Sequence, residues 1–493
     1  MPMRITGFSG VDIDSMVKEL MKAKRAPIDK LNQQKTTLEW QRDQFRDVNI
    51  KLVDFRNNKL FSYGLSESIS AKKATVTGET SAVTAKATSG AQSGAITVEV
   101  GALATAAYAR SSSDLSATSA SKLKDDLGFA TSGGEISVGI NGKTVKVADT
   151  ATIDDLVNAI NSSDANVTAY FDDQAGRLSL TSKSTGESPI ALSSELATKF
   201  NLTDTDDGSD ASVKINGIST TRSSNNFTVN GVEITLNAQT QINKMATIAV
   251  SSNTDKTIET IKSFISDYNG ILDTMNNKVN EEHFRKYTPL TAEQKKELKE
   301  SEIEMWEEKA RSGLLRRDTT LTTLSTNMRM AAYTGVTING VEVNLNDIGI
   351  ETGTWEQRGK LIIKDEAKLR AAIEADPNKV VALFTQKTSS TDPNVKSSPT
   401  NPDSGLFNRL SEAVLTAIED ISKRAGTSKF STDQSASFSV NSTIGERLHQ
   451  LDRRMDEMNR RMVDIETRYF QQFAAMEAAM NRYSAQGSSL FGV

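Results

Sequence analysis

Apolar residues recur at alternating steps of four and three near the end of the chain, with Asp, Glu and Arg side chains between them. This spacing is typical of a coiled-coil helix, whose apolar stripe packs against another helix while its charged sides face water. Gln472 interrupts the stripe, and Met476, Ala479 and Tyr483 resume it. The pattern therefore predicts a long terminal helix with an apolar stripe formed by Ile444, Leu448, Leu451, Met455, Met458, Met462, Ile465 and Tyr469.

A second stripe lies near the start of the chain, after a shorter helix for which Asp12 is the expected N-cap. Pro27 should end or kink that first helix, because proline lacks the backbone N–H that a helix interior uses. Gln34 and Gln41 occupy inner positions of the second stripe and weaken it. Two interpretations stay open: the terminal helices form an antiparallel hairpin within one chain, or neighbouring copies complete both stripes. The residues of this stripe return every seventh position, at Leu31, Leu38, Phe45 and Leu52.

From residue 76 to 250 the chain is rich in Ser, Thr, Ala and Gly, with alternating apolar residues. Such alternation predicts β-strands. Asn-Gly pairs stand between several of these segments, and this dipeptide supplies the positive φ angles of a two-residue type I′ hairpin. We therefore expect hairpins at Asn141-Gly142, Asn216-Gly217, Asn230-Gly231 and, later in the chain, Asn339-Gly340.

The segment 136–192 is expected to form one compact module, with a hairpin, a helix and further strands. Thr152 and Asp155 fit a capping box at the start of the helix, since each side chain can bind the backbone N–H of the other residue. Gly176 is expected to turn the hairpin that follows. The acidic stretch 204–210 lacks the ligand pattern of a calcium loop, and we interpret it as the linker that leaves the module.

A third apolar stripe, from Ile258 to Val279, predicts the main helix of an inner domain. Thr291 and Gln294 then fit a capping box that opens an acidic helix, which contains Trp306 and ends near residue 313. A further helix is expected over residues 406–421. Together with the strand pair expected around Asn339-Gly340, these helices indicate a mixed α/β inner domain.

The predicted fold class is α+β, multidomain and elongated, since 493 residues exceed the size of one core. It comprises long coiled-coil-like terminal helices, a mixed α/β inner domain, and two β-rich outer modules inserted in the middle of the chain. The expected boundaries are 1–66 and 441–493 for the terminal leg segments, 67–76 and 254–440 for the inner domain, 77–108 and 208–253 for one β-rich module, and 109–207 for the inserted outer module.

Composition argues against several classes of protein. The net charge of -5 gives no long-range attraction to nucleic acid, so no nucleic-acid partner is expected. No apolar run reaches the length of a membrane span. The absence of Cys removes disulfides and thiolate metal sites. The first ten residues lack the basic and apolar regions of a cleaved secretory signal, so we expect any export to use another route.

No group of residues fits catalysis or the binding of a cofactor or metal. Gly142-Lys143-Thr144 copies the end of a phosphate-binding loop, but Ser137 stands where that motif requires its first glycine. His283 and His449 each lack a second ligand at helical spacing, which disfavours a zinc site. We therefore expect no catalytic site, no cofactor and no metal.

Two blocks of the sequence carry a family resemblance. The opening block is formed by Ile5-Thr6-Gly7, Ser9 to Asp14, Val17, Leu20-Met21, Arg25, Pro27 and Leu31. The inner block is formed by Tyr287 to Thr291, Glu307, Gly313 to Arg316, Gly359 to Leu361, Asp365, Leu369, Pro377, Val380 and Leu383-Phe384. Both blocks resemble the flagellar hook-associated protein 2 family, the filament-capping proteins, and the Asn-Gly hairpins resemble a motif of flagellin and hook proteins.

The resemblance implies a structural protein of the bacterial flagellum, which forms the cap at the distal end of the filament and promotes folding and insertion of exported flagellin. It implies a secreted protein at the filament tip, exported without a cleaved signal peptide. The implied partners are other copies in a ring of about five or six subunits, flagellin, hook-filament junction proteins, a cytoplasmic export chaperone at the C-terminal helix, and host mucin. The two stripes would then form the leg and oligomerisation surface.

Two other classes of function stay open. An extracellular fibre or phage-tail-like adhesin would bind glycans through the β-rich modules and use the helices to form trimers. A glycan hydrolase would need two carboxylates that face each other across a cleft. The symmetry of the particle would distinguish the adhesin from the cap.

Overall fold

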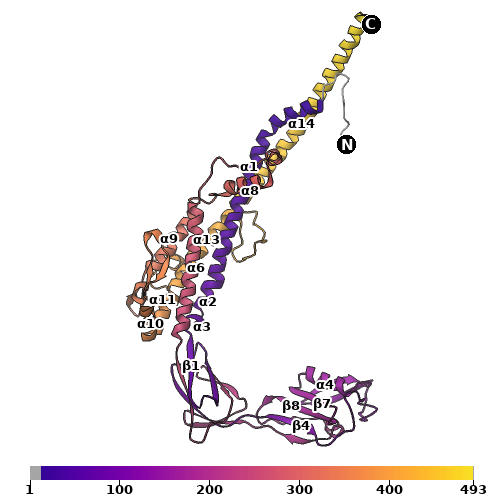
Figure 1. The fold of residues 1–493 in the computed structure, drawn as a ribbon, viewed down its shortest axis with the longest axis vertical. Coiled ribbons are helices and arrows are strands. Elements are labelled where there is room, and N and C mark those ends of the chain that lie inside the picture. Colours follow the sequence, from indigo (N-terminus) through magenta and orange to yellow (C-terminus); the bar gives the residue numbers. More distant parts are fainter. Residues whose placement is uncertain (1–12, 492–493) are drawn as a thin grey trace. The chain divides into compact units, whose positions relative to one another are not determined.

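The computed structural model describes residues 13–491 and divides the chain into two compact units (Figure 1). Unit 1 contains Met1–Ile69 and Asp255–Val493, and unit 2 contains Ser70–Thr254. Helices predominate in unit 1 and strands in unit 2, which confirms the predicted multidomain α+β class. The finer division into four parts stays a prediction, and the expected N-cap Asp12 lies outside the described residues.

Five long helices contribute to the main hydrophobic core of unit 1. The predicted inner helix is confirmed, since the apolar stripe from Ile258 to Met275 is buried in that core. Of the last helix, only its first turns enter the core, through Ile444 and Leu448. The five helices are α1 (Ile13–Asp54), α6 (Thr254–Asn280), α9 (Thr319–Tyr333), α13 (Leu406–Ala425) and α14 (Thr443–Phe491).

Shorter elements complete unit 1. Side-chain caps start several of them: Asp376, for example, accepts a hydrogen bond from the Lys379 N–H at 3.0 Å, and Pro377 occupies the first helical position, where its missing N–H costs nothing. The helices are α2 (Phe61–Gly64), α3 (Ser66–Ile69), α7 (Ala292–Glu297), α8 (Glu300–Arg311), α10 (Glu366–Ala375), α11 (Pro377–Thr385) and α12 (Pro393–Ser397). Two hairpins, β15 (Val336–Ile338) with β16 (Val341–Val343) and β17 (Ile350–Thr352) with β18 (Leu361–Ile363), and the 3-10 turns η2 (Leu345–Ile348) and η3 (Trp355–Gln357) complete the set.

Pro27 does not end the first helix. α1 is continuous from Ile13 to Asp54 and contains Pro27 in its interior. Of the two predicted outcomes, a helix end at Pro27 is wrong, and a kink stays a prediction. A proline inside a helix costs about 3 kcal/mol. Met21 before it and Ile28 and Leu31 after it are buried, and this burial on both sides of the proline stabilises the continuous helix.

A π-helical segment, η1 (Phe55–Leu60), follows α1. Core-facing residues of an α-helix are three or four apart, but the residues at these distances from Phe55 are the polar Asn58 and Lys59. The wider π turn, with hydrogen bonds five residues apart, instead brings Leu60 into the core, where its side chain is 3% exposed. The next residue, Phe61, is 66% exposed.

One core of unit 2 is formed by two antiparallel sheets, in which β3, β10, β13 and β14 bury every second residue along part of their length. In β3, for example, Ile96, Val98 and Val100 are buried. The five-stranded sheet has the order β1 (Lys72–Gly78), β14 (Ala246–Ser252), β3 (Gly94–Ala102), β10 (Ala211–Ile215) and β11 (Ile218–Arg222). The three-stranded sheet has the order β12 (Asn226–Val229), β13 (Val232–Leu236) and β2 (Val83–Ala87).

A second core of unit 2 contains the predicted hairpin, helix and strands, which are confirmed. The capping box is also present: the Asp155 carboxylate accepts a hydrogen bond from the Thr152 N–H at 2.9 Å, and the Thr152 hydroxyl accepts one from the Asp155 N–H at 3.3 Å. The four-stranded sheet has the order β7 (Val167–Asp172), β8 (Arg177–Thr185), β4 (Ala106–Ser111) and β9 (Leu202–Asp206). It is joined by the hairpin β5 (Glu135–Ile140) and β6 (Lys143–Ala148) and by helices α4 (Ile153–Ser162) and α5 (Ser194–Lys199).

Two segments differ from their predicted structure. The acidic stretch 204–210, interpreted as a linker, begins within β9, which pairs with β4 at the edge of its sheet. The acidic helix predicted after Thr291 is divided into α7 and α8, because the backbone is extended at Leu298 and Lys299. Glu302 accepts a hydrogen bond from the Lys299 N–H at 2.9 Å, and this capping contact starts α8 as a separate helix.

All four predicted Asn-Gly hairpins are confirmed. The asparagines have φ angles of 48° to 53°, and the glycines that follow have φ angles of 73° to 81°, as a type I′ turn requires. The turns join β5 to β6, β10 to β11, β12 to β13, and β15 to β16. A dipeptide signal thus fixes the register of each hairpin.

Two of these glycines form a matched pair that can show how much steric crowding by the backbone adds to the cost of a side chain in the first core of unit 2. Gly231 and Gly217 have φ angles of 80° and 81°, but a Cβ on Gly231 would lie 2.8 Å from the Ala91 Cα, whereas one on Gly217 would meet nothing within 4 Å. We expect Gly217→Ala to destabilise unit 2 by about 1 kcal/mol, the cost of the left-handed conformation. Gly231→Ala should cost about 2 kcal/mol more, because its methyl group also displaces the backbone at Ala91.

Amide hydrogen exchange measures this difference, read in β10 and β11 for Gly217→Ala and in β12 and β13 for Gly231→Ala, because it reports local opening of the affected sheet. Urea unfolding followed by circular dichroism gives the corresponding global values. Equal losses in the two variants would contradict the steric argument, since both variants bear the same backbone strain.

Candidate assembly surface

Helices α1 and α14 lie side by side in unit 1 and run in opposite directions (Figure 1). Near the start of α1, Val17 and Met21 are buried against residues 462–473 of α14. Further along, the Lys35 ammonium donates a hydrogen bond to the Asp452 carboxylate at 2.7 Å. This hydrogen bond raises the pKa of Lys35. The antiparallel hairpin within one chain is therefore present.

The predicted stripe of α1 is used largely by the chain's own core. Phe45 and Leu52 are fully buried in the main core of unit 1, and Leu38 is half-buried and packs against that core. Leu31 is also buried. Little of this stripe is accessible to another molecule.

The predicted stripe of α14 changes character along the helix. Ile444 and Leu448 are buried in the main core. The residues that follow, Leu451, Met455 and Met458, are half-buried. The last three, Met462, Ile465 and Tyr469, are half-buried and pack with Phe473 against the first turns of α1. After Leu448 the stripe is therefore only partly covered by the described residues, and its use between copies stays a prediction.

The sequence did not single out Phe473 or Met480, or show that Met476 and Tyr483 are exposed. Met476, Met480 and Tyr483 lie on one side of the helix, at steps of four and three, and are 48%, 46% and 74% exposed. The spacing of the stripe had already indicated Met476 and Tyr483 after the interruption at Gln472, and the structure adds Met480 between them. Exposed Met and Tyr side chains in a row are a common feature of protein interfaces.

A groove opens between α1 and α14 at the point where the stripe leaves the core. Its volume is about 420 Å³. Two predicted stripe residues, Leu38 and Leu451, line it together with Thr37, and Arg447 and Arg454 provide the charged groups. No carboxylate is among the lining residues. An apolar side chain beside an acidic group would therefore fit this groove.

Polar contacts that the sequence did not predict hold the segment around α7 and α8 against α1. Gln33 donates to the Pro289 carbonyl at 2.7 Å, Gln41 to the Leu314 carbonyl at 3.1 Å, and Gln44 to the Arg311 carbonyl at 2.6 Å. Gln41 is one of the two glutamines that weaken the α1 stripe in the sequence. Its side chain satisfies a backbone acceptor far away in the chain.

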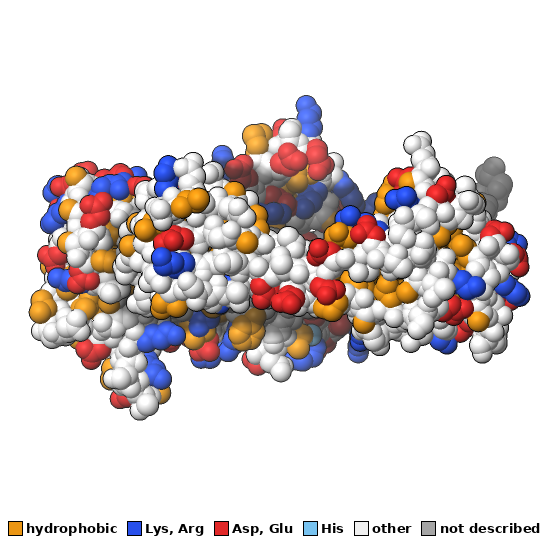
Figure 2. Space-filling view, turned by 90° about the horizontal axis from the view of Figure 1, so that it is seen from below, with side chains coloured by type: hydrophobic (Ala, Val, Ile, Leu, Met, Phe, Trp, Pro, Cys, Tyr) orange, Lys and Arg blue, Asp and Glu red, His pale blue; other side chains and the backbone are white. Residues whose placement is uncertain are grey.

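The part of the chain that the structure describes contains no group of three or more His, Asp or Glu residues placed to hold a metal ion. Residues 13–491 also contain no helix that is both long and apolar enough to span a bilayer. Figure 2 shows one face of the molecule, on which acidic and basic side chains are interspersed among uncharged ones.

Comparisons with known proteins agree along the whole chain. A family model described as the C-terminus of flagellar hook-associated protein 2 matches residues 208–485, and a model of the N-terminus of the same protein matches residues 9–107. A model of the flagellin hook IN motif matches residues 131–184. This last match includes the first Asn-Gly hairpin.

The chain is 31% identical to flagellar hook-associated protein 2 of Halalkalibacterium halodurans over 538 residues, which cover 99% of each chain. It is 30% identical to flagellar hook-associated protein 2 of Thermotoga maritima over 267 residues, or 50% of this chain and 40% of the relative. The crystal structure of the D1-D2-D3 domains of the flagellar cap protein FliD from Escherichia coli has a similar fold. It covers 85% of this chain and 99% of that one, with a TM-score of 0.50 and 20% sequence identity.

Proposed function

Because the chain belongs to the flagellar hook-associated protein 2 family and has its structural, filament-capping role, we propose that its copies assemble at the distal end of the bacterial flagellar filament. There they would promote the folding and insertion of exported flagellin subunits. The match over 99% of both chains favours this function over the glycan-binding adhesin. The relatives indicate a flagellar location; export without a cleaved signal peptide is part of the proposal.

The observation that carries the proposal is the partly covered stripe of α14. A stripe buried completely by its own chain would have no surface left for a partner, whereas Met455, Met458 and Met462 remain half-exposed. Unbranched thioether side chains repack readily against different neighbours. We infer that α14 forms weak, repeatable contacts with flagellin and with neighbouring copies, so that the cap can advance as each subunit is added.

The finer partners belong to the same proposal. We propose a closed ring of about five or six copies, contact with the hook-filament junction proteins, and an export chaperone that covers α14 before secretion. The exposed apolar residues at the end of α14 support the chaperone, because such a face needs a cover while the chain is in the cell. Host mucin is retained as a partner of the outer modules on the family resemblance alone. We further propose a structural protein without catalytic activity.

The experiment is removal of the gene from its own bacterium, followed by electron microscopy of the cells and an assay of flagellin in the medium. We expect cells without full-length filaments and with soluble flagellin in the medium, because exported subunits would leave the tip without being inserted. Expression of the intact chain should restore filaments and motility. Normal filaments in cells that lack the chain would rule out the proposed role.

A further inference from the structure

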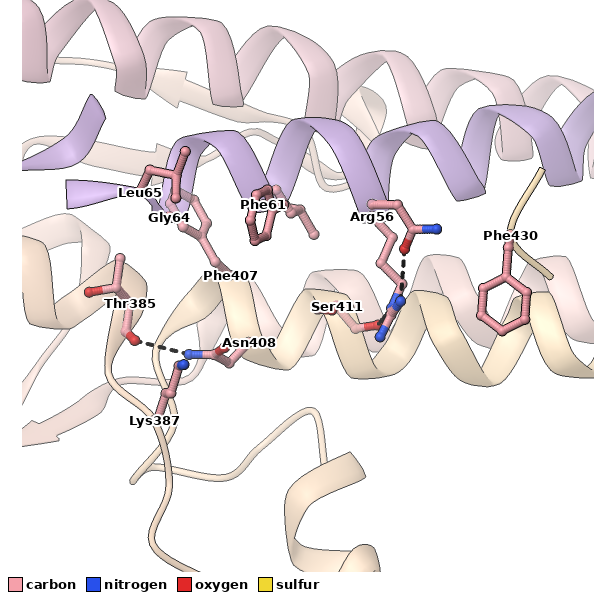
Figure 3. A pocket seen from close by; sticks show the side chains of 12 residues that line it. Arg56, Phe61, Gly64, Leu65, Thr385, Lys387, Phe407, Asn408, Ser411 and Phe430 are labelled. Atoms are coloured by element: carbon pink, nitrogen blue, oxygen red, sulfur yellow. Dashed lines mark hydrogen bonds between the residues drawn. The ribbon is translucent and has the colours of Figure 1, made fainter. Parts of the chain in front are cut away.

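A second groove of unit 1 lies away from the α1 and α14 pair, between the segment 56–65 and helix α13 (Figure 3). Its volume is about 640 Å³, a size typical of a binding cleft. Phe61, Leu65 and Phe430 line it and are 66%, 45% and 78% exposed. Single exposed apolar residues are ordinary, but three around one groove indicate an interaction surface.

The backbone explains why Phe61 faces outward. The π turn of η1 places Leu60 in the core, and Phe61, one residue later, is therefore rotated away from it. The groove is thus a consequence of the irregular helix, and π turns often occur at functional sites. Phe407 forms the buried floor beneath Phe61, so the site has a fixed apolar base.

The charged groups of the groove are cations. Arg56 and Lys387 line it, and no Asp or Glu is among the lining residues. Arg56 donates to the Ser411 carbonyl at 3.1 Å and to the Asn57 side-chain oxygen at 2.8 Å (Figure 3), and neither cation has a carboxylate within 4.0 Å among the described residues. An occupant that presents an apolar side chain flanked by carboxylates would match both features.

Helix α8 of the same sequence presents such a face. Met305 is 59% exposed, and Glu304 and Glu308 are exposed next to it, one turn apart on the helix surface. Neither glutamate has a cation within 4.0 Å among the described residues, whereas Glu307, on the inner side, pairs with Lys295 at 2.6 Å and with Arg311 at 3.5 Å. Glu304 and Glu308 line, with Glu307, a groove that also contains Gln44 and Lys278 of the same chain, but both remain exposed. They can therefore meet a cation of another molecule.

Helix α8 cannot reach the groove of its own chain. The Gln44 amide holds the end of α8 on α1 through the Arg311 carbonyl at 2.6 Å, and Arg56 at the groove lies twelve residues further along the helix, a rise of about 18 Å. A second copy can bring the two surfaces together. We propose that α8 of one copy docks into the groove of a neighbouring copy, with Met305 between Phe61 and Phe430 and with Glu304 and Glu308 beside Arg56 and Lys387.

This contact joins two different surfaces, so each copy can offer α8 to one neighbour and its groove to another. Such a head-to-tail contact produces a closed ring or an open helical array, and not an isolated twofold dimer. The proposal rests on the proposed function, since it supplies one contact of the assembly at the filament tip.

Disulfide trapping tests the contact directly, because the chain contains no cysteine of its own. Full-length chains that carry Met305→Cys are mixed with chains that carry Phe430→Cys and are oxidised mildly. In the control, Val463→Cys replaces Met305→Cys; Val463 is an equally exposed site on α14. We expect the cross-linked pair to be several-fold more abundant with Met305→Cys than in this control. Addition of Glu304→Lys and Glu308→Lys to the first chain should abolish the excess, and Lys387→Glu in the second chain should restore part of it.

A yield no higher than that of the Val463→Cys control, or a yield unaffected by the charge reversals, would overturn the inference. The proposed function is scored separately, by filament growth in cells that express each cysteine variant under reducing conditions. If growth is normal and trapping fails, the cap function stands and the α8 contact is wrong. If variants of Phe61 and Phe430 abolish growth while trapping fails, the groove receives a different molecule, and the inference is again rejected.

Discussion

Replacement of Met476, Met480 and Tyr483 by serine is expected to leave the chain folded and to abolish filament growth. All three side chains are about half or more exposed in the isolated chain, so their removal takes little apolar area out of the fold. In an assembly the same residues would be covered by a partner, and large side chains such as Tyr dominate the binding energy of interfaces. The effect should therefore appear in assembly and not in stability.

The measurement is filament length by electron microscopy in cells that lack the native chain and express the triple variant. Val463→Ser is the matched control, because Val463 is 61% exposed on the same helix and, at 3.6 residues per turn, faces away from the three test residues. The control should support normal filaments. Normal filaments with the triple variant would show that this face of α14 has no role in assembly.

Serine at Leu448 would be a poor test of the same surface. Leu448 belongs to the heptad stripe in the sequence, but its side chain is buried in the main core of unit 1 together with Ile444. Truncation of a buried leucine typically lowers the free energy of unfolding by about 2 kcal/mol or more. A growth defect would then report unfolding and not loss of a partner.

The features that sequence alone predicted well depend on a few neighbouring residues. Asn-Gly fixes a type I′ turn within two positions, and Thr152 with Asp155 fixes a helix start within four. Each signal acts in the same way whatever surrounds it. This is why all four hairpins and the start of α4 could be predicted without knowledge of the tertiary structure.

The features that sequence missed depend on distant partners. Pro27 remains inside a continuous helix because Met21 and Leu31 on either side are buried. Gln41 appears as a defect of the apolar stripe until its bond to the Leu314 carbonyl, 273 residues away, is known. Phe55 and Leu60 are five residues apart, a spacing that a regular α-helix does not place on one face. The π turn at η1 brings both side chains into the core, and the need for it is apparent only once the core is known.

The sequence predicted where the candidate surface lies, but not which of its residues are buried and which are exposed. Heptad spacing identifies residues that pack on another helix, but the spacing is the same whether that helix belongs to the same chain or to a partner. The structure divides the α14 stripe into a buried start at Ile444, a half-covered middle, and an exposed end at Tyr483. This division directs the tests of assembly to the end of the helix.

Asp318→Ala is expected to lower the free energy of unfolding of unit 1 by about 2 kcal/mol, because it removes a helix cap and an ion pair whose arginine is 40% exposed. The Asp318 side chain is 2% exposed and pairs with Arg424 of α13. It also accepts a hydrogen bond from the Leu321 N–H at 3.1 Å and so caps α9. The Arg424 guanidinium lies 4.9 Å from the ring centroid of Phe45. One carboxylate therefore links α9 to α13 and, through Arg424, to α1.

The control is Asp365→Ala, which removes a cap of the same kind from α10. Asp365 accepts a hydrogen bond from the Lys368 N–H at 2.9 Å, but its side chain is exposed and has no ion pair among the described contacts. Its loss should cost about 1 kcal/mol. Urea unfolding followed by tryptophan fluorescence separates the two values, because all three tryptophans, Trp40, Trp306 and Trp355, belong to unit 1. Equal midpoint shifts in the two variants would mean that the pair with Arg424 adds nothing to the cap. A larger shift for Asp318→Ala would show that the polar link between the three helices stabilises the base from which α14 extends.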